Sequence, residues 1–350
     1  MTNTSARRGV ILMNLGSPDS TEVKDVYRYL MEFLMDRRVI DYSYLKRLLL
    51  VGGIIVPFRA AKSAAAYRSI WTEEGSPLIV ITQQLQEAVQ ARLEEPVEIA
   101  MRYGKPSVAR AYDNLLKRLP ELEEVIAIPL YPHYAMSSYE TAVEHAKTVH
   151  KKGKYSFSLS FIRPVYNEKH YIQALAESIS PYLQQEYDHI LFSYHGVPGR
   201  HIRKSDITGN HCLQTPDCCQ TASPAHAFCY RHQCFTTTRI ITEKLNIPAN
   251  RYSISFQSRL GKGWLEPFTD IRLAELPKEG KKKIIVLCPA FVSDCLETLE
   301  EIAVEGRETF LHAGGESFTF IPCMNTGTAW VDAIALWIKE YSDGERSMIF

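Results

Sequence analysis

Short apolar runs rich in β-branched residues alternate along this chain with segments whose apolar residues recur at helical spacing. The runs that predict strands are Val10–Leu15, Val97–Arg102, Val125–Leu130, Phe157–Phe161, His189–Ser193, Tyr252–Phe256, Ile284–Leu287 and Phe318–Ile321. The segments that predict helices include Glu22–Met35, Ile81–Leu93, Tyr139–His150, Glu168–Leu183 and Cys234–Leu245. Continuous apolar strands separated by helices are typical of a parallel sheet covered on both faces. The pattern therefore predicts an α/β protein.

The pattern of the first half of the chain returns in the second half. "ILMNLGSP" and "ILFSYHGVP" each place a Gly-x-Pro loop after a strand, and "IPLYPHYAMSSYETAVE" matches "LCPAFVSDCLETLEE" in its strand, early proline, loop and helix. We expect two similar doubly wound halves that meet at a cleft. The first comprises residues 1–165 with 325–350, and the second comprises residues 166–324 with an insertion at about 207–229. Ligands of open α/β sheets bind beyond the carboxyl ends of the strands.

Composition and charge exclude several classes of protein. A hydrophobic content of 45% and a charged content of 23% are typical of a soluble globular protein. Forty basic residues balance forty acidic ones, so no overall field attracts nucleic acid. The N-terminus lacks the pattern of a signal peptide, and we expect a cytoplasmic protein whose cysteines are reduced. The motifs of nucleotide-binding, nicotinamide-binding and serine-hydrolase sites are absent from the sequence.

His195 ends the apolar run of "HILFSYHGVPGR", beside Gly196 and Pro198, which shape a tight loop. Many histidines serve only as hydrogen-bonded side chains. A histidine at the carboxyl end of a strand in an open sheet is also well placed to bind a metal or to accept a proton. Both interpretations are open for His195.

Three carboxylates follow the strand of "CPAFVSDCLETLEEIAVEGRETF". Asp294 can begin a helix, with Glu297 closing a capping box, which would give Glu297 a structural role. Glu301 and Glu305 follow at helical spacing, so the three glutamates predict one acidic stripe. The stripe is either a solvated face or a path that passes a cation or protons. Carboxylate oxygen with imidazole nitrogen suits a borderline divalent metal such as ferrous iron.

A tryptophan lies in the glycine-rich segment "SFQSRLGKGWLEPFTD". Trp264 could pack in the core, which is the usual place of a tryptophan. Gly261 and Gly263 favour a loop instead, and an exposed aromatic residue beside a cleft would suit a flat hydrophobic ligand.

The sequence resembles the ferrochelatase family over nearly its whole length. The segments that carry the resemblance are, in order, "VILMNLGSPDS", "FLMDRRVID", "YRSIWTEEGSPL", "MRYGKPS", "PLYPHYAMSSYETA", "FSYHGVP", "FQSRLGKGWLEP" and "AFVSDCLETLEEI". The resemblance implies a lyase that inserts ferrous iron into protoporphyrin IX, forming protohaem with release of two protons. It also implies a chelatase-like fold of two Rossmann-like halves around a central porphyrin cleft.

The resemblance assigns roles to particular residues. It implies that His195 and Glu297 flank the metal and that Glu301 and Glu305 serve its passage or that of protons. It implies porphyrin contacts for the following residues: Leu15, Arg102, Tyr103, Pro198 and Trp264. The "NLGSP" start is closer to the branch of the family that uses protoporphyrin IX. Arg37 and Arg38 are candidates for binding the propionates at the mouth of the cleft.

Other functions remain open beside this one. The chain could be a chelatase for coproporphyrin III or for another metal, or a carrier that binds porphyrin or metal without turnover. The apolar run Leu48–Val56 has half the length of a membrane span, so it either touches the membrane surface or packs as a core helix. The sequence does not give the oligomeric state.

The insertion Ile207–Cys229 holds four of the eight cysteines of the chain, spaced C-x5-C-C-x9-C. Some ferrochelatases carry a [2Fe–2S] cluster, and the resemblance makes this the first interpretation for Cys212, Cys218, Cys219 and Cys229. Zinc bound by mixed Cys and His ligands is the second, and a loop of free thiols is the third. Cys234 is a reserve ligand.

Overall fold

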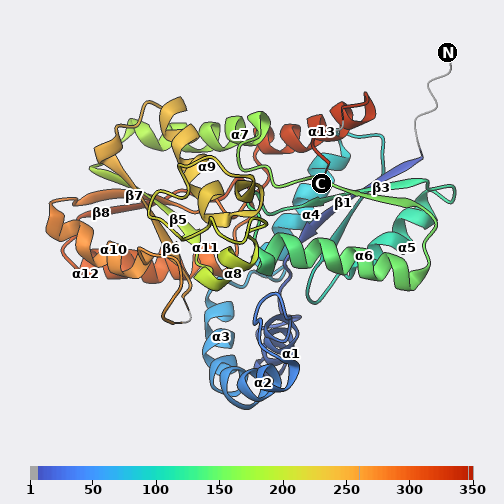
Figure 1. Cartoon of the computed structure of the whole chain (residues 1–350), viewed down its shortest axis with the longest axis horizontal. Coiled ribbons are helices and arrows are strands. Elements are labelled where there is room, and N and C mark those ends of the chain that lie inside the picture. Colours follow the sequence, from blue (N-terminus) through green and yellow to red (C-terminus); the bar gives the residue numbers. More distant parts are fainter. Residues whose placement is uncertain (1–6, 260, 346, 350) are drawn as a thin grey trace. The chain divides into compact units, whose positions relative to one another are not determined.

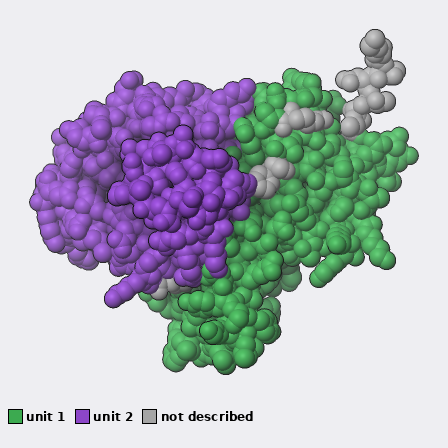
Figure 2. Space-filling view, viewed as in Figure 1, with its two compact units in different colours: residues 1–130, 136–164, 331–350 green, residues 131–135, 165–330 purple. Residues whose placement is uncertain are grey.

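Each half of the chain builds its own four-stranded parallel sheet, flanked by helices (Figure 1). The computed structural model describes residues 7–259, 261–345 and 347–349. Residues 1–6, in which we expected no signal peptide, lie outside the described residues. Two units can be distinguished (Figure 2). Unit 1 comprises residues 1–130, 136–164 and 331–350, and unit 2 comprises residues 131–135 and 165–330.

The division departs from the expected one in three places. Residues 131–135, 165 and 325–330, which we assigned to the N-terminal half, belong to unit 2. Residues 131–135 follow the third strand of unit 1 but bond to residues of α9 in unit 2. The His133 ring lies 2.9 Å from the Thr237 hydroxyl, and the backbone N–H of Tyr134 donates to the Gln233 side chain at 2.7 Å.

The sheet of unit 1 has the strand order β2-β1-β3-β4. Its strands are β1 Arg8–Asn14, β2 Val97–Met101, β3 Glu124–Pro129 and β4 Ser158–Phe161. Every residue of β1 is buried, as the continuous apolar run predicted. The helices of this unit are α1 Val23–Leu34, α2 Tyr44–Leu50, α3 Val56–Ile70, α4 Pro77–Gln90, α5 Val108–Arg118 and α6 Thr141–Gly153, and α13 Thr328–Ser342 closes the chain.

The sheet of unit 2 repeats this topology in the order β6-β5-β7-β8. Its strands are β5 His189–His195, β6 Tyr252–Gln257, β7 Lys283–Leu287 and β8 Ser317–Phe320. Its helices are α7 Lys169–Ile179, α8 Gly199–Lys204, α9 Tyr230–Lys244, α10 Thr269–Glu275, α11 Leu296–Leu299 and α12 Arg307–His312. Two parallel sheets of the same order confirm the prediction of two doubly wound α/β halves.

The helix predicted from Cys234 begins four residues earlier, at Tyr230. The sequence gives no signal for this start, because Tyr230 to Gln233 carry no apolar repeat. Tertiary contacts bury Tyr230 and Gln233 instead.

The apolar run Leu48–Val56 lies inside a longer helical stretch. Helix α2, a π-helical turn Val51–Ile55 and helix α3 follow one another without a break, and in Figure 1 they extend with α1 away from the sheet of unit 1. The stretch Tyr44–Ile70 is the one candidate among the described residues for a helix that could cross a membrane, on length and composition alone. Val51 and Val56 pack against Leu34 and Ile40. The run is therefore longer than we expected and is buried on one face only.

Candidate functional site

The candidate site of unit 2 lies where β5 and β7 diverge. These strands are neighbours, and the helical connections after them lead to opposite sides, with β6 beyond β5 and β8 beyond β7. Such a switch point leaves a crevice at the carboxyl ends of the two strands. His195 is the last residue of β5, and β7 leads through residues 288–295 into α11. The strand order thus brings the histidine and the glutamate helix to one edge of the sheet.

His195 is half-buried, and its backbone is held from two sides. The Tyr230 hydroxyl donates to the His195 carbonyl at 2.9 Å, and the Gly196 N–H donates to the Gln257 carbonyl at 2.8 Å. A Cβ atom on Gly196 would lie 2.7 Å from that Gln257 oxygen, so glycine is needed for the approach. Loop 195–196 is therefore fixed to both β6 and α9.

The ring of His195 has a defined tautomer. Nδ1 lies 2.6 Å from the Gly196 carbonyl oxygen. A carbonyl oxygen only accepts hydrogen bonds, so Nδ1 carries the proton and, in the neutral ring, Nε2 keeps its lone pair. The ring is thereby prepared to bind a metal ion or to accept a proton at Nε2.

The capping box that we expected from Asp294 and Glu297 is wrong. Helix α11 begins after Cys295, which forms the capping box with Thr298. The Asp294 carboxylate instead accepts hydrogen bonds from the Thr298 hydroxyl at 2.9 Å and from the Asn325 amide at 2.7 Å. Glu297 is therefore free of a capping role, which favours the functional interpretation of its carboxylate.

The predicted stripe of three glutamates does not follow a regular α-helix. Helix α11 ends at Leu299, and Glu301–Gly306 is a π-helical turn in which the Glu305 N–H donates to the Glu300 carbonyl at 2.9 Å. A π-turn shifts the register and often marks a functional site. Glu305 is exposed, whereas Glu297 and Glu301 are half-buried. Two of the three carboxylates therefore belong to the site, and Glu305 lies at its solvent side.

Glu301 is held by Ser258, the residue that follows β6. The Ser258 N–H donates to one Glu301 carboxylate oxygen at 2.7 Å, and its hydroxyl donates to the other. Ser258 has a φ of +62°, a left-handed conformation that is uncommon for serine and lets both donors reach the same carboxylate. The sequence gave no reason to select Ser258, although its position directly after a strand of the same sheet was a usable signal.

The electrostatics connect Glu301 with His195 and Glu297. Burial and the neighbouring Glu297 carboxylate raise the pKa of Glu301, while the hydrogen bond from Ser258 and the proximity of the His195 ring lower it. The net shift is upward, so Glu301 holds a proton to a higher pH than an exposed glutamate. An imidazole that accepts protons thus lies near a carboxyl group that can carry one and a second carboxylate that can bind a cation.

Trp264 is neither a core residue nor fully exposed. It is half-buried, and it pairs with Pro198 in an isolated antiparallel bridge beside the loop of His195. Its Cε3 atom would lie 3.3 Å from a Cβ atom on Gly196. Pro198, the backbone partner of Trp264, is itself buried, and its contact with the porphyrin stays a prediction.

The remaining predicted porphyrin contacts belong to unit 1. Leu15 follows β1 and is half-exposed between buried neighbours. Arg102 and Tyr103 are bound to Asp36, Tyr103 through its hydroxyl at 3.0 Å and Arg102 through an ion pair. The Tyr103 side chain is buried within unit 1, and its contact with the porphyrin stays a prediction.

Asp36 is the centre of this network, and the sequence analysis missed it. Burial raises the pKa of Asp36, but hydrogen bonds from Thr141 and from the Arg38 backbone, with the charge of Arg102, lower it overall. The Asp36 carboxylate is therefore ionised, and its oxygens accept hydrogen bonds from the surrounding side chains. The Arg38 guanidinium is paired with Glu140 at 2.8 Å, whereas Arg37 is exposed.

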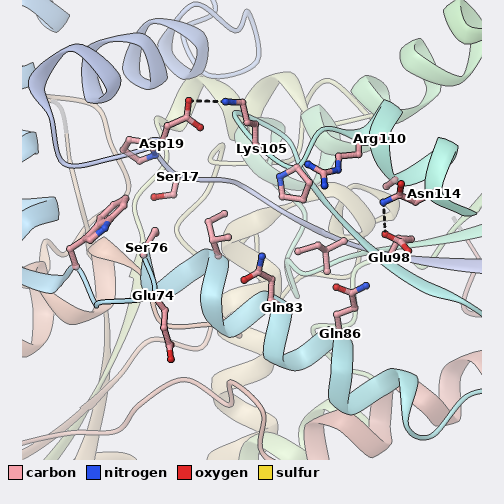
Figure 3. Close-up of a pocket in the computed structure, with 17 residues that line it drawn as sticks. Ser17, Asp19, Glu74, Ser76, Gln83, Gln86, Glu98, Lys105, Arg110 and Asn114 are labelled. Atoms are coloured by element: carbon pink, nitrogen blue, oxygen red, sulfur yellow. Dashed lines mark hydrogen bonds and ion pairs between the residues drawn. The ribbon is translucent and has the colours of Figure 1, made fainter.

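A polar pocket of about 430 Å³ lies in unit 1 beside the edge strand β2 (Figure 3). Six of its lining residues are Ser17, Ser76, Gln83, Glu98, Lys105 and Arg110. In Figure 3 the Lys105 ammonium reaches Asp19 at 3.1 Å, and the Asn114 amide reaches Glu98 at 3.1 Å. Charged and amide groups dominate its lining, which differs from the apolar walls expected around the face of a porphyrin.

The four cysteines of the insertion lie together in unit 2, each at most 9% exposed. The neighbouring Cys229 thiol and burial raise the pKa of Cys219, and burial raises that of Cys212. The Arg231 guanidinium donates to the sulfur of Cys219 at 3.4 Å and to that of Cys218 at 3.7 Å.

The insertion is fastened by Asp206. Its carboxylate accepts hydrogen bonds from the N–H groups of His211 and Cys212, both at 2.8 Å. Within the described residues, no group of three or more His, Cys, Asp and Glu side chains is placed to hold a metal ion. This finding supports neither the zinc interpretation nor the [2Fe–2S] interpretation of the four cysteines, and both stay predictions.

The comparisons with known proteins agree with the motifs. The Ferrochelatase family profile matches residues 7–342. A ferrochelatase from Opitutus terrae is 50% identical over 338 residues, which cover 95% of this chain and 97% of that protein. A ferrochelatase from Pseudomonas fluorescens (strain Pf0-1) is 49% identical over 330 residues, covering 93% and 96%.

Solved structures agree on the fold. SirB from Bacillus subtilis with Fe3+ has a TM-score of 0.56 at 12% identity, covering 98% of this chain and 99% of SirB. The sirohydrochlorin chelatase SirB from Bacillus subtilis subspecies spizizenii in complex with cobalt has a TM-score of 0.53 at 10% identity. At this identity the likeness concerns the fold alone. The family match and the close relatives confirm the resemblance: the chain belongs to the ferrochelatase family, lyases that insert a metal into a porphyrin in haem synthesis.

Proposed function

We propose that this enzyme inserts ferrous iron into protoporphyrin IX and releases two protons to form protohaem. The observation that carries the proposal is the arrangement around His195, whose Nε2 is left as an acceptor by the 2.6 Å contact of Nδ1 with Gly196. Removal of the pyrrole protons requires such a base at the face of the macrocycle. Leu15, at the end of β1, is a further contact that we assign to the porphyrin.

In the proposed mechanism, His195 Nε2 accepts the first pyrrole proton and the Glu297 carboxylate helps to bind the incoming Fe2+. Glu301 relays protons from the imidazole, since its raised pKa suits a group that gains and loses a proton during turnover. The Gln257 amide connects the two glutamates, because its N–H groups donate to the Glu297 backbone carbonyl at 2.7 Å and to the Glu301 carboxylate at 3.5 Å. The exposed Glu305 is the outermost position of this path.

Anaerobic incubation of the enzyme with Fe2+ and protoporphyrin IX tests the proposal, with loss of porphyrin fluorescence and growth of the haem spectrum as the readout. Parallel reactions contain coproporphyrin III, and Zn2+ or Co2+ in place of Fe2+. We expect the highest kcat/KM for Fe2+ with protoporphyrin IX. A higher kcat/KM with coproporphyrin III or with another metal would replace this substrate assignment by the corresponding alternative.

We propose in addition that Cys212, Cys218, Cys219 and Cys229 hold a [2Fe–2S] cluster. Four buried thiols of one insertion supply the number of ligands that such a cluster divides between two irons. Buried thiols with raised pKa values become thiolates only beside positive charge, which irons and Arg231 would supply. The cluster would bring one-electron redox chemistry and metal-dependent order to the insertion.

Protein purified without oxygen tests the cluster. We expect a red-brown colour, with two irons and two acid-labile sulfides per chain. Replacement of any of the four cysteines by Ser should bleach the colour. Matched Ser variants of Cys288, Cys295 and Cys323, which lie outside the insertion, should keep it. One zinc without sulfide, or an active protein without metal, would contradict the proposal.

We propose that the enzyme works in the cytoplasm and touches the membrane surface through one face of α2 and α3. Large apolar side chains on this face are exposed, among them Leu49 at 65% and Phe58 at 80%. An apolar face beside Lys46 and Arg59 is typical of a helix that lies in the interface of an anionic membrane. The reducing cytoplasm also keeps the thiols of the insertion available to iron.

Co-sedimentation with vesicles of neutral and anionic lipid tests this contact. We expect wild-type protein to bind the anionic vesicles, and the double variant Leu49→Ser/Phe58→Ser to lose most of this binding. Ile271→Ser on α10 removes an exposed apolar side chain at 42% exposure from the other unit and serves as the control. Equal binding of all three proteins would contradict the proposal.

A further inference from the structure

The first turn of α9 joins the cysteine insertion to the loop of His195. Cys229 is the N-cap of this helix, so a predicted ligand of the cluster directly precedes its first residue, Tyr230. The Tyr230 side chain is 4% exposed, and its hydroxyl donates to the backbone carbonyl of His195 at 2.9 Å. One peptide bond therefore separates a cysteine of the insertion from a residue that holds the candidate base.

The next two residues of this turn point to the insertion. The Arg231 guanidinium donates to the sulfurs of Cys218 and Cys219. The His232 ring donates through Nδ1 to the Cys219 carbonyl at 2.8 Å. The first turn of α9 is therefore bound to the cysteine pair on one side and to the active-site loop on the other.

Further contacts make the turn rigid. The Gln233 amide donates to the Ala227 carbonyl at 2.9 Å, and its oxygen accepts from the Tyr134 N–H at 2.7 Å. The Cys234 thiol, four residues along the same helix, is fully buried. The Tyr230 ring also packs edge-to-face on His133, with the ring centroids 6.0 Å apart. A helix turn with all its groups occupied moves as one body, so a shift at the cysteines reaches the Tyr230 hydroxyl.

We propose that Tyr230 is a positioning residue for His195, and that the state of the cysteine insertion acts on metal insertion through it. With the insertion ordered, the hydroxyl holds the His195 carbonyl and aims Nε2 at the pyrrole nitrogens. With the cysteines oxidised, replaced or without their metal, the start of α9 loses its anchors and the hydroxyl leaves the carbonyl. This inference rests on the proposed role of His195, and the insertion thereby gives the enzyme a control element.

A double-mutant cycle tests the coupling, with Tyr230→Phe, Cys219→Ser and the combined variant. Tyr230→Phe removes the hydroxyl and keeps the ring. We expect each single change to lower kcat about five- to tenfold, with the KM for porphyrin within about twofold of wild type. The combined variant should lose no more than Cys219→Ser alone, because both changes break the same connection. Arg231→Ala replaces Cys219→Ser in the cycle if the cysteine variant does not fold.

Hydrogen exchange of the peptide around residues 189–203 gives a readout that does not depend on turnover. Exchange in this loop should rise equally in both single variants and no further in the combined one. Tyr194→Phe is the matched control, because Tyr194 is an equally buried tyrosine whose hydroxyl bonds to Thr238 at 2.8 Å and not to His195. It should leave kcat and loop exchange unchanged.

Two results would overturn the inference. One is a Tyr230→Phe enzyme with wild-type kcat and loop exchange. The other is a combined variant whose loss is the product of the two single losses, since independent sites multiply. His195→Ala is measured in the same series to separate this inference from the proposed function. If that variant remains active, the assignment of His195 as the base is wrong, regardless of the result for Tyr230→Phe.

Discussion

At the carboxyl end of β1 in unit 1 lies Leu15, and at the equivalent end of β5 in unit 2 lies His195. The strand orders are the same, so the two residues occupy corresponding positions of a repeated fold. Unit 1 offers an apolar side chain there, and unit 2 offers a base. The repeat therefore fixes where a site can form in each unit, while the side chains at the strand ends decide what it does.

The polar groups behind these positions also differ. In unit 1, Asp36 is fully satisfied by Arg102, Tyr103 and Thr141, so the network stabilises the fold. In unit 2, His195 keeps a free acceptor, and the Glu301 carboxyl has a raised pKa beside Glu297. A network in which every donor and acceptor is hydrogen-bonded rigidifies a structure. Groups that keep an unused acceptor or have a shifted pKa are typical of catalytic sites.

Each unit also carries an insertion between its first and second strands. In unit 1 it forms α1 to α3 with an exposed apolar face, and in unit 2 it holds the buried cysteines. The insertion at this position therefore carries an exposed apolar surface in unit 1 and a candidate metal site in unit 2. Four substitutions test whether catalysis and stability are divided between the units in this way.

The largest effect is expected from His195→Ala in unit 2. Loss of the base should reduce kcat about 100-fold or more, since a positioned acid–base group contributes about 10²–10⁴ in rate. The melting temperature should change little, because the ring is half-buried and its Nδ1 bonds to the carbonyl of the neighbouring residue, Gly196. Haem formation and thermal unfolding by circular dichroism measure the two quantities. A variant that keeps more than a tenth of the activity contradicts the assignment.

Asp36→Asn in unit 1 should instead lower stability. Removing one partner of a buried ion pair costs about 3 kcal/mol, because the Arg102 charge is left without compensation. The pKa of Asp36 is lowered in the folded state, so its contribution is present above the unfolded pKa of about 3.9 and is lost as the pH falls through the folded pKa. Urea unfolding between pH 3 and 7 should therefore show a flatter acid limb for Asp36→Asn than for wild type.

Asp19→Asn is the control for this experiment. Asp19 forms exposed ion pairs with Lys105 and Arg28, and such pairs contribute at most about 1 kcal/mol. Its substitution should leave both the stability and its pH dependence close to wild type. If Asp36→Asn lowers kcat of the folded enzyme as strongly as His195→Ala does, the division of roles between the units is wrong.

Glu297→Gln should reduce kcat about tenfold to 100-fold. Glu305→Gln should keep kcat within about twofold of wild type, although both residues belong to the stripe predicted from the sequence. The reason is that the π-turn Glu301–Gly306 leaves Glu305 exposed, while Glu297 remains half-buried. Initial rates at saturating and limiting Fe2+ distinguish a loss of metal binding from a slower proton transfer. Equal losses of kcat in the two variants would instead support a functional stripe that includes Glu305.

The smallest effect is expected from Trp264→Ala. The ring packs against the loop of His195, so its removal should raise the KM for porphyrin about three- to tenfold and lower kcat less. Titration with porphyrin, followed by the absorbance of the porphyrin itself, measures the affinity without relying on tryptophan fluorescence. A drop in melting temperature with unchanged porphyrin affinity would identify Trp264 as a structural residue only.

Local sequence signals were sufficient for much of this molecule. The eight predicted strands are present, each within three residues of its expected ends. In the central strands the reason is that burial on both faces needs a continuous apolar run. The repeated order of strand, loop and helix predicted two similar halves and placed His195 at a strand end. The motifs predicted the family, which the relatives confirm.

Local signals failed where contacts between distant segments decide the structure. The capping box moved from Asp294 to Cys295 because Asn325 and Thr298 occupy the Asp294 carboxylate. The glutamate stripe was broken because burial of Ile302 in the core of unit 2 accompanies a π-turn, which no helical periodicity indicates. The hydrogen bond of Tyr103 to Asp36, 67 residues away, had no local signal either.

What the sequence alone determined is thus the number and order of the strands, the position of the base at the end of β5, and the family. What only the tertiary structure decided is which polar groups are already satisfied. Periodicity specifies the face on which a side chain lies, but the partner that it meets there comes from elsewhere in the chain. Ser258, Asp36 and Tyr230 acquire their roles in this way, through hydrogen bonds to residues that are remote in sequence and adjacent only after folding.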